Sequence, residues 1–275
     1  MAAPGRVLVT GGNKGIGKAL CRQLAVDHGY HVLLGSRDAS RGQAAVDEIV
    51  ASAPEVKDRV ELVELDVAQD ASVAKAAEAV ASKYGKEGAL KGIINNAGMG
   101  FGQSLPDTFG VNFWGPKRVC DAFIPLLCQK SGRVVNTSSA SGPMFVQKVG
   151  GEMGKVLTDP AVTFDQIEAI VQQGMENSEL EGDAYGFSKA CLNAYTMVLA
   201  RAHPHLAING MTPGFIDTDI TAGMGASKTP EEGTKVALHC LMGKLEGNGR
   251  YYGSDAVRSP LDRYRGPGDP PYEGP

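Results

Sequence analysis

Tyr185 and Lys189 are two residues whose types and spacing could transfer a proton. They lie four positions apart, so on a helix their side chains share one face. A tyrosine in water has a pKa of about 10 and is a poor proton donor at neutral pH. A lysine ammonium about 4 Å away would lower that pKa by roughly three units at an effective dielectric constant of about 20. The pair predicts a general acid, Tyr185, tuned by Lys189; an exposed helical pair without function is the alternative.

A glycine-rich turn near the N-terminus predicts a nucleotide site. It reads Thr10-Gly11-Gly12-Asn13-Lys14-Gly15-Ile16-Gly17 and lies between a predicted strand and a segment with helical apolar spacing. Glycines permit the tight turn and let a pyrophosphate approach backbone N–H groups at the positive end of a helix. A plain turn between a strand and a helix is the alternative, but the placement favours dinucleotide binding. The candidate contacts are Gly11, Asn13, Lys14, Gly15, Ile16 and Gly17.

Arg37 indicates which dinucleotide the site prefers. It follows Gly17 by twenty residues, at the end of the second predicted strand, where an NAD site carries a carboxylate for the ribose 2′-hydroxyl. A guanidinium there, together with Lys14, suits a 2′-phosphate with about 1.5 to 2 negative charges. Asp38 comes one residue later and would point away. The sequence therefore predicts NADPH rather than NADH, with two solvated surface cations as the alternative.

Alternating strand and helix patterns must position these residues. Short apolar runs and helical repeats alternate up to about residue 240, which is typical of βαβ units. We expect an α/β protein with a Rossmann-like, doubly wound parallel sheet of about seven strands and helices on both faces. Ligands would bind beyond the carboxyl ends of the strands. The predicted strands are 6–10, 30–35, 60–65, 92–95, 133–136, 207–211 and 250–252.

Two segments interrupt this alternation within an expected single domain over residues 1–275. A helical insertion at about 143–183 contains Thr163 and Gln166, which are spaced as a capping box at the start of a helix. The C-terminal segment 253–275 is rich in proline, so its end cannot be a helix or a central strand. It is either a frayed tail or an extended arm on the body. Its prolines are Pro260, Pro267, Pro270, Pro271 and Pro275.

Composition excludes several classes of partner. A formal net charge of −4 predicts binding to neither nucleic acid nor an anionic membrane surface. The first residues lack the basic and apolar segments of a signal peptide, and no run is long enough to span a membrane. The five cysteines are scattered and the histidines lack ligand spacing, so we expect neither disulfides nor a metal site. Together these features predict a cytoplasmic protein.

Further motifs occur in an order that resembles a known family. Asn95-Asn96-Ala97-Gly98 ends a predicted strand, Asn112 lies on the next helix, and Ser138-Ser139 follows another strand. Tyr185-Gly186-Phe187-Ser188-Lys189 and Pro213-Gly214-Phe215-Ile216-Asp217-Thr218 come later. With the glycine-rich turn, they make residues 5–252 resemble the short-chain dehydrogenase/reductase family. Within it the chain most resembles the monomeric NADPH-dependent carbonyl reductases, through the glycine-rich turn, Ser36-Arg37-Asp38 and residues 41–46.

The resemblance implies roles for individual residues. Ser139 would hydrogen-bond the substrate oxygen and stabilise its developing charge, beside Tyr185 as the acid. Asn112 would hold a water that links Lys189 to solvent, and Lys189 would also bind the nicotinamide ribose. The implied cofactor contacts are Asp66 and Val67 at the adenine, Asn96, Ala97 and Gly98 along the ribose, and Pro213, Gly214, Ile216 and Thr218 near the carboxamide. The implied substrate contacts are Ser139, Ala140, Tyr185 and Phe215.

The function expected from these features is reduction of a small-molecule ketone, aldehyde or quinone by NADPH. Alternatives are a dedicated biosynthetic ketone reductase or alcohol dehydrogenase of the same family, and a catalytically idle NADP-binding sensor. Only fourteen residues separate Gly98 from Asn112, which is shorter than usual in the family. Ser139 and Tyr185 are 46 residues apart, as in carbonyl reductases, where the extra segment covers a helical face used elsewhere for dimerisation. We therefore expect a monomer.

Overall fold

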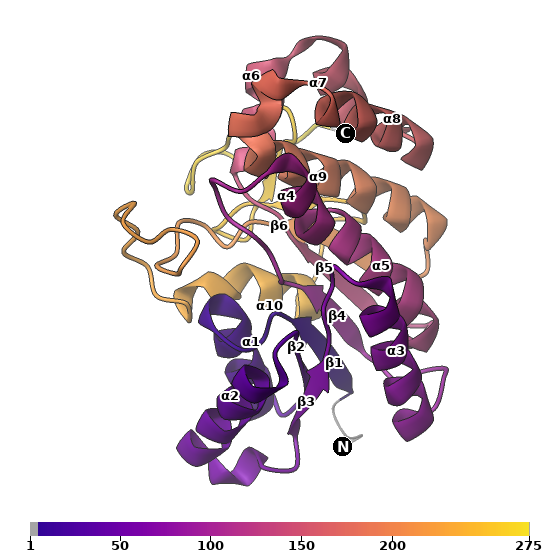
Figure 1. Cartoon of the computed structure of the whole chain (residues 1–275), viewed down its shortest axis with the longest axis vertical. Coiled ribbons are helices and arrows are strands. Elements are labelled where there is room, and N and C mark those ends of the chain that lie inside the picture. The colour runs from indigo at the N-terminus through magenta and orange to yellow at the C-terminus, as the bar shows by residue number, and fades with distance from the viewer. Residues whose placement is uncertain (1–4, 275) are drawn as a thin grey trace.

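A sheet of eight strands runs through residues 5–274, the part of the chain that this computed structural model describes (Figure 1). Residues 1–4 and Pro275 lie outside it. The strand order is β3-β2-β1-β4-β5-β6-β7-β8, and all neighbours are parallel except β7 and β8. This confirms the α/β class and the doubly wound parallel sheet. The strands are β1 (Arg6–Thr10), β2 (His31–Ser36), β3 (Val60–Glu64), β4 (Gly92–Asn95), β5 (Arg133–Thr137), β6 (Ala207–Met211), β7 (Tyr251–Tyr252) and β8 (Arg258–Ser259).

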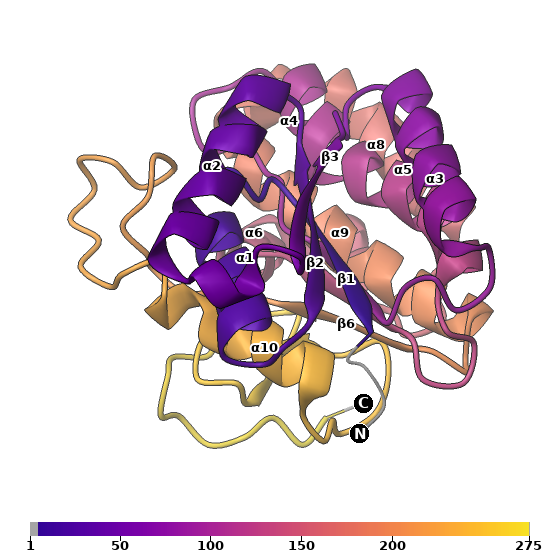
Figure 2. The same cartoon turned by 90° about the horizontal axis from the view of Figure 1, so that it is seen from below.

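Helices cover both faces of the sheet because its central strands are apolar on both sides (Figure 2). In β1, Val7 and Val9 belong to one buried cluster and Leu8 belongs to the other. The first face carries α1 (Gly15–Val26), α2 (Ala39–Ser52) and α10 (Lys235–Met242). The second carries α3 (Asp70–Tyr84), α4 (Leu105–Asn112), α5 (Trp114–Phe123) and α9 (Ala184–Ala202). Within residues 5–274, no helix combines the length and apolar character needed to cross a bilayer.

The helical insertion contains three α-helices rather than one. They are α6 (Ser141–Val149), α7 (Gly151–Thr158) and α8 (Phe164–Met175). Gly150 separates α6 from α7, and Gly151 begins α7; their φ angles of 54° and 55° are in a region that other residues rarely adopt. Thr163 and Gln166 form the capping box at the start of α8. All three helices pack against α9 and so support the helix that carries Tyr185 and Lys189.

The C-terminal segment forms an extended arm rather than a frayed tail. The strand β8 pairs with β7 at the edge of the sheet and ends just before Pro260, so the sheet has one strand more than the seven expected. Residues 260–274 then continue without helix or strand. The arm returns to the turn between β7 and β8, where Arg265 pairs with Asp255.

Candidate active site

The glycine-rich turn between β1 and α1 is shaped to receive a phosphate group. Gly11 and Gly15 have φ of 65° and 51°, which is the region that favours glycine. A Cβ on Gly17 would overlap the carbonyl oxygen of Gly11. Lys14 is the N-cap residue of α1 and makes no side-chain capping hydrogen bond, so the first amides of the helix stay open to an anion. The packing around Gly17 and the open helix end fit a dinucleotide pyrophosphate.

Thr10 links the glycine-rich turn to the loop after β4, a role that the sequence did not reveal. Its hydroxyl oxygen accepts hydrogen bonds from the backbone N–H groups of Asn96 and Ala97, both at 3.0 Å. The Asn96 side chain donates back to the carbonyl oxygens of Thr10 and Gly11 at 3.0 and 3.3 Å. The available signal in the sequence was a threonine at the end of the apolar run 7–9. The predicted ribose contacts thus lie directly beside the turn.

Arg37 and Asp38 follow β2 and have different surroundings. Arg37 is exposed and makes no ion pair or hydrogen bond with any residue from 5 to 274. The Asp38 carboxylate caps α2 by accepting a hydrogen bond from the Arg41 N–H at 2.9 Å, and it also contacts the Arg41 guanidinium. Because the Asp38 carboxylate is already engaged as the cap of α2, the charged group that is free to contact a ligand here is the Arg37 guanidinium. This arrangement fits a 2′-phosphate better than a 2′-hydroxyl.

Lys14 has a partner that the sequence did not predict. Its ammonium pairs with Asp219 on the loop after β6, and the hydrogen bond and charge of Lys14 lower the pKa of that carboxyl group. On the same loop, the Thr218 methyl carbon would lie 3.4 Å from a Cβ on Gly15. The loop therefore crosses the glycine-rich turn. Both charged side chains are exposed, so the pair contributes little stability.

The other predicted cofactor contacts lie at the carboxyl ends of β3 and β6. Asp66 accepts a hydrogen bond from the Ala68 N–H at 3.0 Å, and Val67 packs against α5. Gly214 has a φ of 93° and follows Pro213 at the end of β6. Ile216 is buried and packs with Ile16 around Gly233, which joins this loop to the start of α1. These positions surround one edge of the sheet, as the sequence predicted.

Lys189 is buried in α9 next to the end of β5. Only 4% of the residue is exposed, and its Nζ donates a hydrogen bond to the Thr137 carbonyl oxygen at 2.8 Å. The Nζ lies 5.8 Å from the centre of the Tyr185 ring. Burial lowers the pKa of Lys189 to about 8, because the charged form loses solvation. The spacing of four residues does bring the two side chains together.

Tyr185 and Ser139 also meet, but the pKa of Tyr185 differs from the sequence-based expectation. Burial raises this pKa, and a hydrogen bond with the Ser139 side chain partly opposes that rise. Lys189 was predicted to lower it. Instead, the removal of water dominates, and the Lys189 ammonium is directed to the Thr137 carbonyl oxygen. The phenol therefore stays protonated at neutral pH.

Asn112 positions the loop after β4. It is fully buried at the end of α4, and its Oδ1 accepts a hydrogen bond from the Met99 N–H at 2.8 Å. Its Nδ2 donates to the Met99 carbonyl oxygen and to the Ser188 hydroxyl, both at 3.1 Å. A Cβ on Gly98 would lie 3.4 Å from the Asn112 Oδ1 and 3.7 Å from the Lys189 Nζ. Met99 and Ser188 thus occupy the hydrogen-bonding atoms of the Asn112 side chain, and the water that Asn112 was expected to hold stays a prediction.

Of the predicted substrate contacts, Ser139 and Tyr185 lie together, and the structure adds one residue beside them. Ala140 is the N-cap residue of α6, directly after Ser139, and Phe215 is half exposed on the loop after β6. The added residue is Phe101, whose ring centre lies 4.5 Å from that of Tyr185. Its place in a short glycine- and serine-rich loop gave no sequence signal. An aromatic side chain therefore packs against the Tyr185 ring.

Known proteins resemble this chain in sequence and in structure. The model of a family described as short chain dehydrogenase matches residues 5–150. The chain is 36% identical over 269 residues to (+)-neomenthol dehydrogenase from Arabidopsis thaliana, which spans 83% of this chain and 88% of that protein. It is 30% identical over 257 residues to carbonyl reductase (NADPH) 1 from Homo sapiens, spanning 86% and 90%. The solved structure of salutaridine reductase from Papaver somniferum matches with a TM-score of 0.80 and 28% identity, over 90% of this chain and 99% of that one.

Proposed function

The chain belongs to the short-chain dehydrogenase/reductase family and is related to its carbonyl reductases, and we propose on that premise that it reduces carbonyl compounds with NADPH. One observation carries the proposal. Ser139, Tyr185 and Lys189 converge beside a glycine-rich turn whose shape fits a dinucleotide. A ketone, aldehyde or quinone carbonyl would lie with its oxygen between the Ser139 and Tyr185 hydroxyls.

The preference for NADPH rests on charges near the end of β2. Arg37 is exposed and unpaired within residues 5–274, while Asp38 is used as the cap of α2. Lys14 lies on the neighbouring turn and needs only to release an exposed, weak ion pair with Asp219. The two cations would hold the 2′-phosphate, and the amides at the start of α1 would hold the pyrophosphate.

In the proposed mechanism Ser139, Tyr185 and Lys189 each have one role. NADPH, when bound, supplies the hydride. Ser139 donates a hydrogen bond to the substrate oxygen and stabilises the negative charge that grows there. Tyr185 donates its proton to this oxygen. Its raised pKa keeps the proton on the phenol at neutral pH, and the proton is transferred because the alkoxide that hydride addition forms on the substrate is a much stronger base than a phenolate. Lys189, held by the Thr137 carbonyl oxygen, places a positive charge near the phenolate that remains.

NADPH consumption in the presence of a panel of carbonyl compounds tests the proposal. The panel contains quinones, aromatic aldehydes, ketosteroids and cyclic plant ketones. We expect turnover with several of them in the wild type. The Tyr185→Phe variant should lose at least a thousandfold in kcat while binding NADPH normally, because only the transferred proton is removed. Tyr195→Phe, at a buried tyrosine ten residues further along α9, is the matched control and should keep its activity.

Other results would favour the alternative functions. Activity with one compound alone would indicate a dedicated biosynthetic reductase or alcohol dehydrogenase. NADPH binding without turnover on any compound would indicate a sensor and refute the proposal, as would full activity of the Tyr185→Phe variant.

We also propose that the chain is monomeric and cytoplasmic. The helices α6, α7 and α8 pack against α9 and cover the face that dimeric relatives would use. A dimer or tetramer mass in light scattering would contradict this. The five cysteines are free, which suits a reducing compartment.

A further inference from the structure

The Arg118 side chain on α5 joins three segments that belong to different parts of the chain. Its Nε donates a hydrogen bond to the Asp70 carboxylate at 2.6 Å, at the start of α3. One terminal nitrogen donates to the Val67 carbonyl oxygen at 3.4 Å, in the loop after β3, and to the Gly110 carbonyl oxygen at 3.1 Å, near the end of α4. A guanidinium suits this role because its donors lie in one plane and can meet several acceptors at once.

The loop after β3, residues 65–69, lies on the part of the sheet that receives the adenosine half of a dinucleotide. The strand order β3-β2-β1-β4-β5-β6 consists of two mononucleotide-binding halves, and β1, β2 and β3 form the first. The Leu65 N–H donates to the Ser36 carbonyl oxygen at 2.9 Å, directly before Arg37. A dinucleotide whose 2′-phosphate lies at Arg37 would therefore have its adenine beside this loop.

Few side chains hold the loop after β3 in place. Among residues 5–274, Ser72 and Arg118 are the two side chains outside the loop that form hydrogen bonds with it, and Ser72 accepts one from the Asp66 N–H at 2.9 Å. The Val67 side chain packs on α5, where a Cβ on Gly115 would lie 3.0 Å from the Val67 Cγ2. Ser72 belongs to α3, so Arg118 is the polar link between this loop and α5.

The end of α4 does not depend on Arg118 in the same way. Gly110 is in the last turn of α4, where carbonyl oxygens lack partners within the helix. Asn112, two residues later, is fixed by its hydrogen bonds to Met99 and Ser188. Loss of the Arg118 guanidinium should therefore displace the loop after β3 and leave the catalytic side of the site in place.

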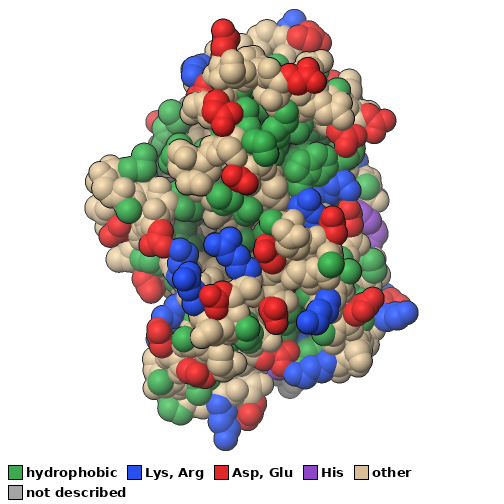
Figure 3. Space-filling model, viewed as in Figure 1, with side chains coloured by type: hydrophobic (Ala, Val, Ile, Leu, Met, Phe, Trp, Pro, Cys, Tyr) green, Lys and Arg blue, Asp and Glu red, His purple; other side chains and the backbone are tan. Residues whose placement is uncertain are grey.

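A nearby acidic residue does not distinguish Arg118 from other cations. Figure 3 shows Lys and Arg side chains beside Asp and Glu side chains on the face of the molecule seen in Figure 1. Lys117, the preceding residue, pairs in this way with Asp121 on its own helix, at 2.7 Å. What distinguishes Arg118 is its hydrogen bonds to two backbone carbonyl oxygens of other segments.

We propose that Arg118 is a positioning residue for the adenine half of the dinucleotide. It acts through the Val67 carbonyl oxygen, which fixes the loop after β3 against α5, and does not itself touch the cofactor. A loop that is fixed before binding loses less conformational freedom when the adenine binds, and the affinity rises accordingly. This inference rests on the proposed use of NADPH.

Isothermal titration calorimetry with adenosine 2′,5′-bisphosphate tests the role of Arg118. This probe carries the adenine and the 2′-phosphate but no nicotinamide. Arg118→Gln should raise the Kd of the probe and of NADPH about tenfold. Turnover with reduced nicotinamide mononucleotide, which lacks the adenosine half, should stay within about twofold of wild type. Arg118→Lys keeps the charge without the planar set of donors, so it should raise both Kd values about threefold and decides the question if Arg118→Gln folds poorly.

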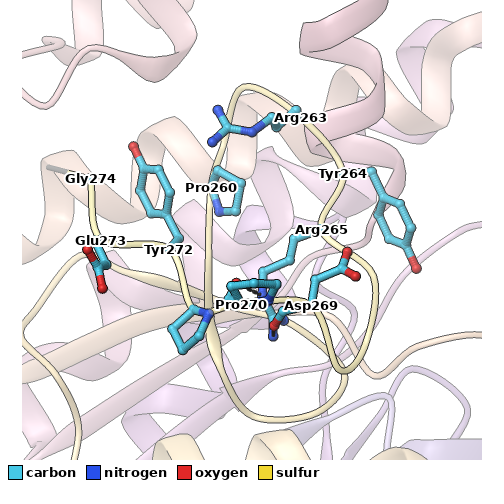
Figure 4. Close-up of a pocket in the computed structure, with 10 residues that line it drawn as sticks. Pro260, Arg263, Tyr264, Arg265, Asp269, Pro270, Tyr272, Glu273 and Gly274 are labelled. Carbon is cyan, nitrogen blue, oxygen red and sulfur yellow. Dashed lines mark hydrogen bonds between the residues drawn. The ribbon is translucent and has the colours of Figure 1, made fainter.

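Two controls separate positioning from a loss of charge or of stability. Lys117→Gln removes the neighbouring cation on α5 and should leave the Kd of the probe unchanged. Arg265→Gln removes the ion pair with Asp255 and should lower Tm without changing that Kd, because β8 and β3 are the opposite edges of the sheet. Figure 4 shows Arg265 among the arm residues that line an open cavity of about 660 Å³, formed by residues 260–274 alone.

Wild-type affinity of Arg118→Gln for the bisphosphate would overturn the inference. So would an equal loss of turnover with reduced nicotinamide mononucleotide, because the effect would then not be confined to the adenine half. If the wild type binds the bisphosphate but reduces no carbonyl compound, the proposed reduction fails, and the Kd values still decide the role of Arg118. A wild type that binds neither the bisphosphate nor NADPH would overturn the proposed function together with the inference.

Discussion

Replacing Lys189 with methionine should make the protein more stable and less active. Lys189 is 4% exposed, and no carboxylate among residues 5–274 forms an ion pair with it. Burial lowers its pKa from 10.5 to about 8, a difference that corresponds to about 3 kcal/mol of unfavourable free energy for the buried ammonium. Methionine keeps most of the apolar stem and removes the charge. It also removes the hydrogen bond to the Thr137 carbonyl oxygen, which offsets about 1 kcal/mol of the gain.

The stabilisation should depend on pH in a defined direction. Between about pH 8 and pH 10.5 the unfolded chain binds the Lys189 proton more strongly than the folded chain. The free energy of unfolding of the wild type therefore rises with pH across this range. Below pH 8 the cost of burying the Lys189 ammonium is fully present, so the Lys189→Met variant should be about 2 kcal/mol more stable than the wild type at pH 7. Near pH 10.5 the advantage should disappear.

Urea unfolding followed by circular dichroism at pH 7 and at about pH 10 measures both effects. Lys86→Met is the matched control, because Lys86 is exposed and lies outside the site, and its effect should be the same at both values. Turnover of the Lys189→Met variant with NADPH should fall at least a hundredfold, since the charge beside Tyr185 is lost. A variant that is less stable at pH 7, or a stability difference independent of pH, would show that the burial argument is wrong.

Three further substitutions test the nucleotide site. Arg37→Asp should lower the ratio of kcat/KM for NADPH to that for NADH by about a hundredfold, because a carboxylate would face the 2′-phosphate; an unchanged ratio would exclude Arg37 from this contact. Asp219→Asn frees Lys14 and should lower the Kd for NADPH a few-fold at low salt, with a smaller effect at high salt. A decrease in Kd of the same size at low and at high salt would point to a non-electrostatic cause. Gly17→Ala should weaken NADPH binding at least tenfold and lower Tm, because the added Cβ overlaps the Gly11 carbonyl oxygen. If calorimetry finds wild-type affinity for NADPH, the glycine-rich turn does not bind the pyrophosphate as proposed.

The sequence predicted the sheet well because each central strand has a recognisable local pattern of apolar residues. Val7, Leu8 and Val9 form an uninterrupted apolar run, which is what a strand covered on both faces requires. The strand β8 gave no such signal, since its two residues, Arg258 and Ser259, are polar and form the edge of the sheet, where they pair only with β7. The turn between β7 and β8 is joined to the C-terminal arm by the Asp255–Arg265 ion pair, and such contacts form only in the folded protein.

Contacts between distant parts of the chain were the main features that the sequence could not give. The pairing of Lys14 with Asp219 spans 205 residues, and the hydrogen bonds from the loop after β4 to Thr10 span 86 and 87. Motif spacing predicted that Lys14 is a cation near a phosphate, and that prediction concerns only the glycine-rich turn itself. What else approaches that turn depends on the path of the loop after β6, and no local pattern determines that path.

The Tyr185–Lys189 pair shows a different limit, because spacing determines proximity but not solvation. An ammonium beside a phenol in a wet site lowers the phenol pKa, and that was the basis of the sequence prediction. In the structure, the loss of water around both groups disfavours both charged forms, so the phenol pKa rises and the lysine pKa falls to about 8. A lysine with a pKa near 8 exchanges its proton near neutral pH more readily than one in water. In the proposed reduction, the same burial that weakens the tuning of Tyr185 would therefore make Lys189 a better source of the proton that Tyr185 must recover after each turnover.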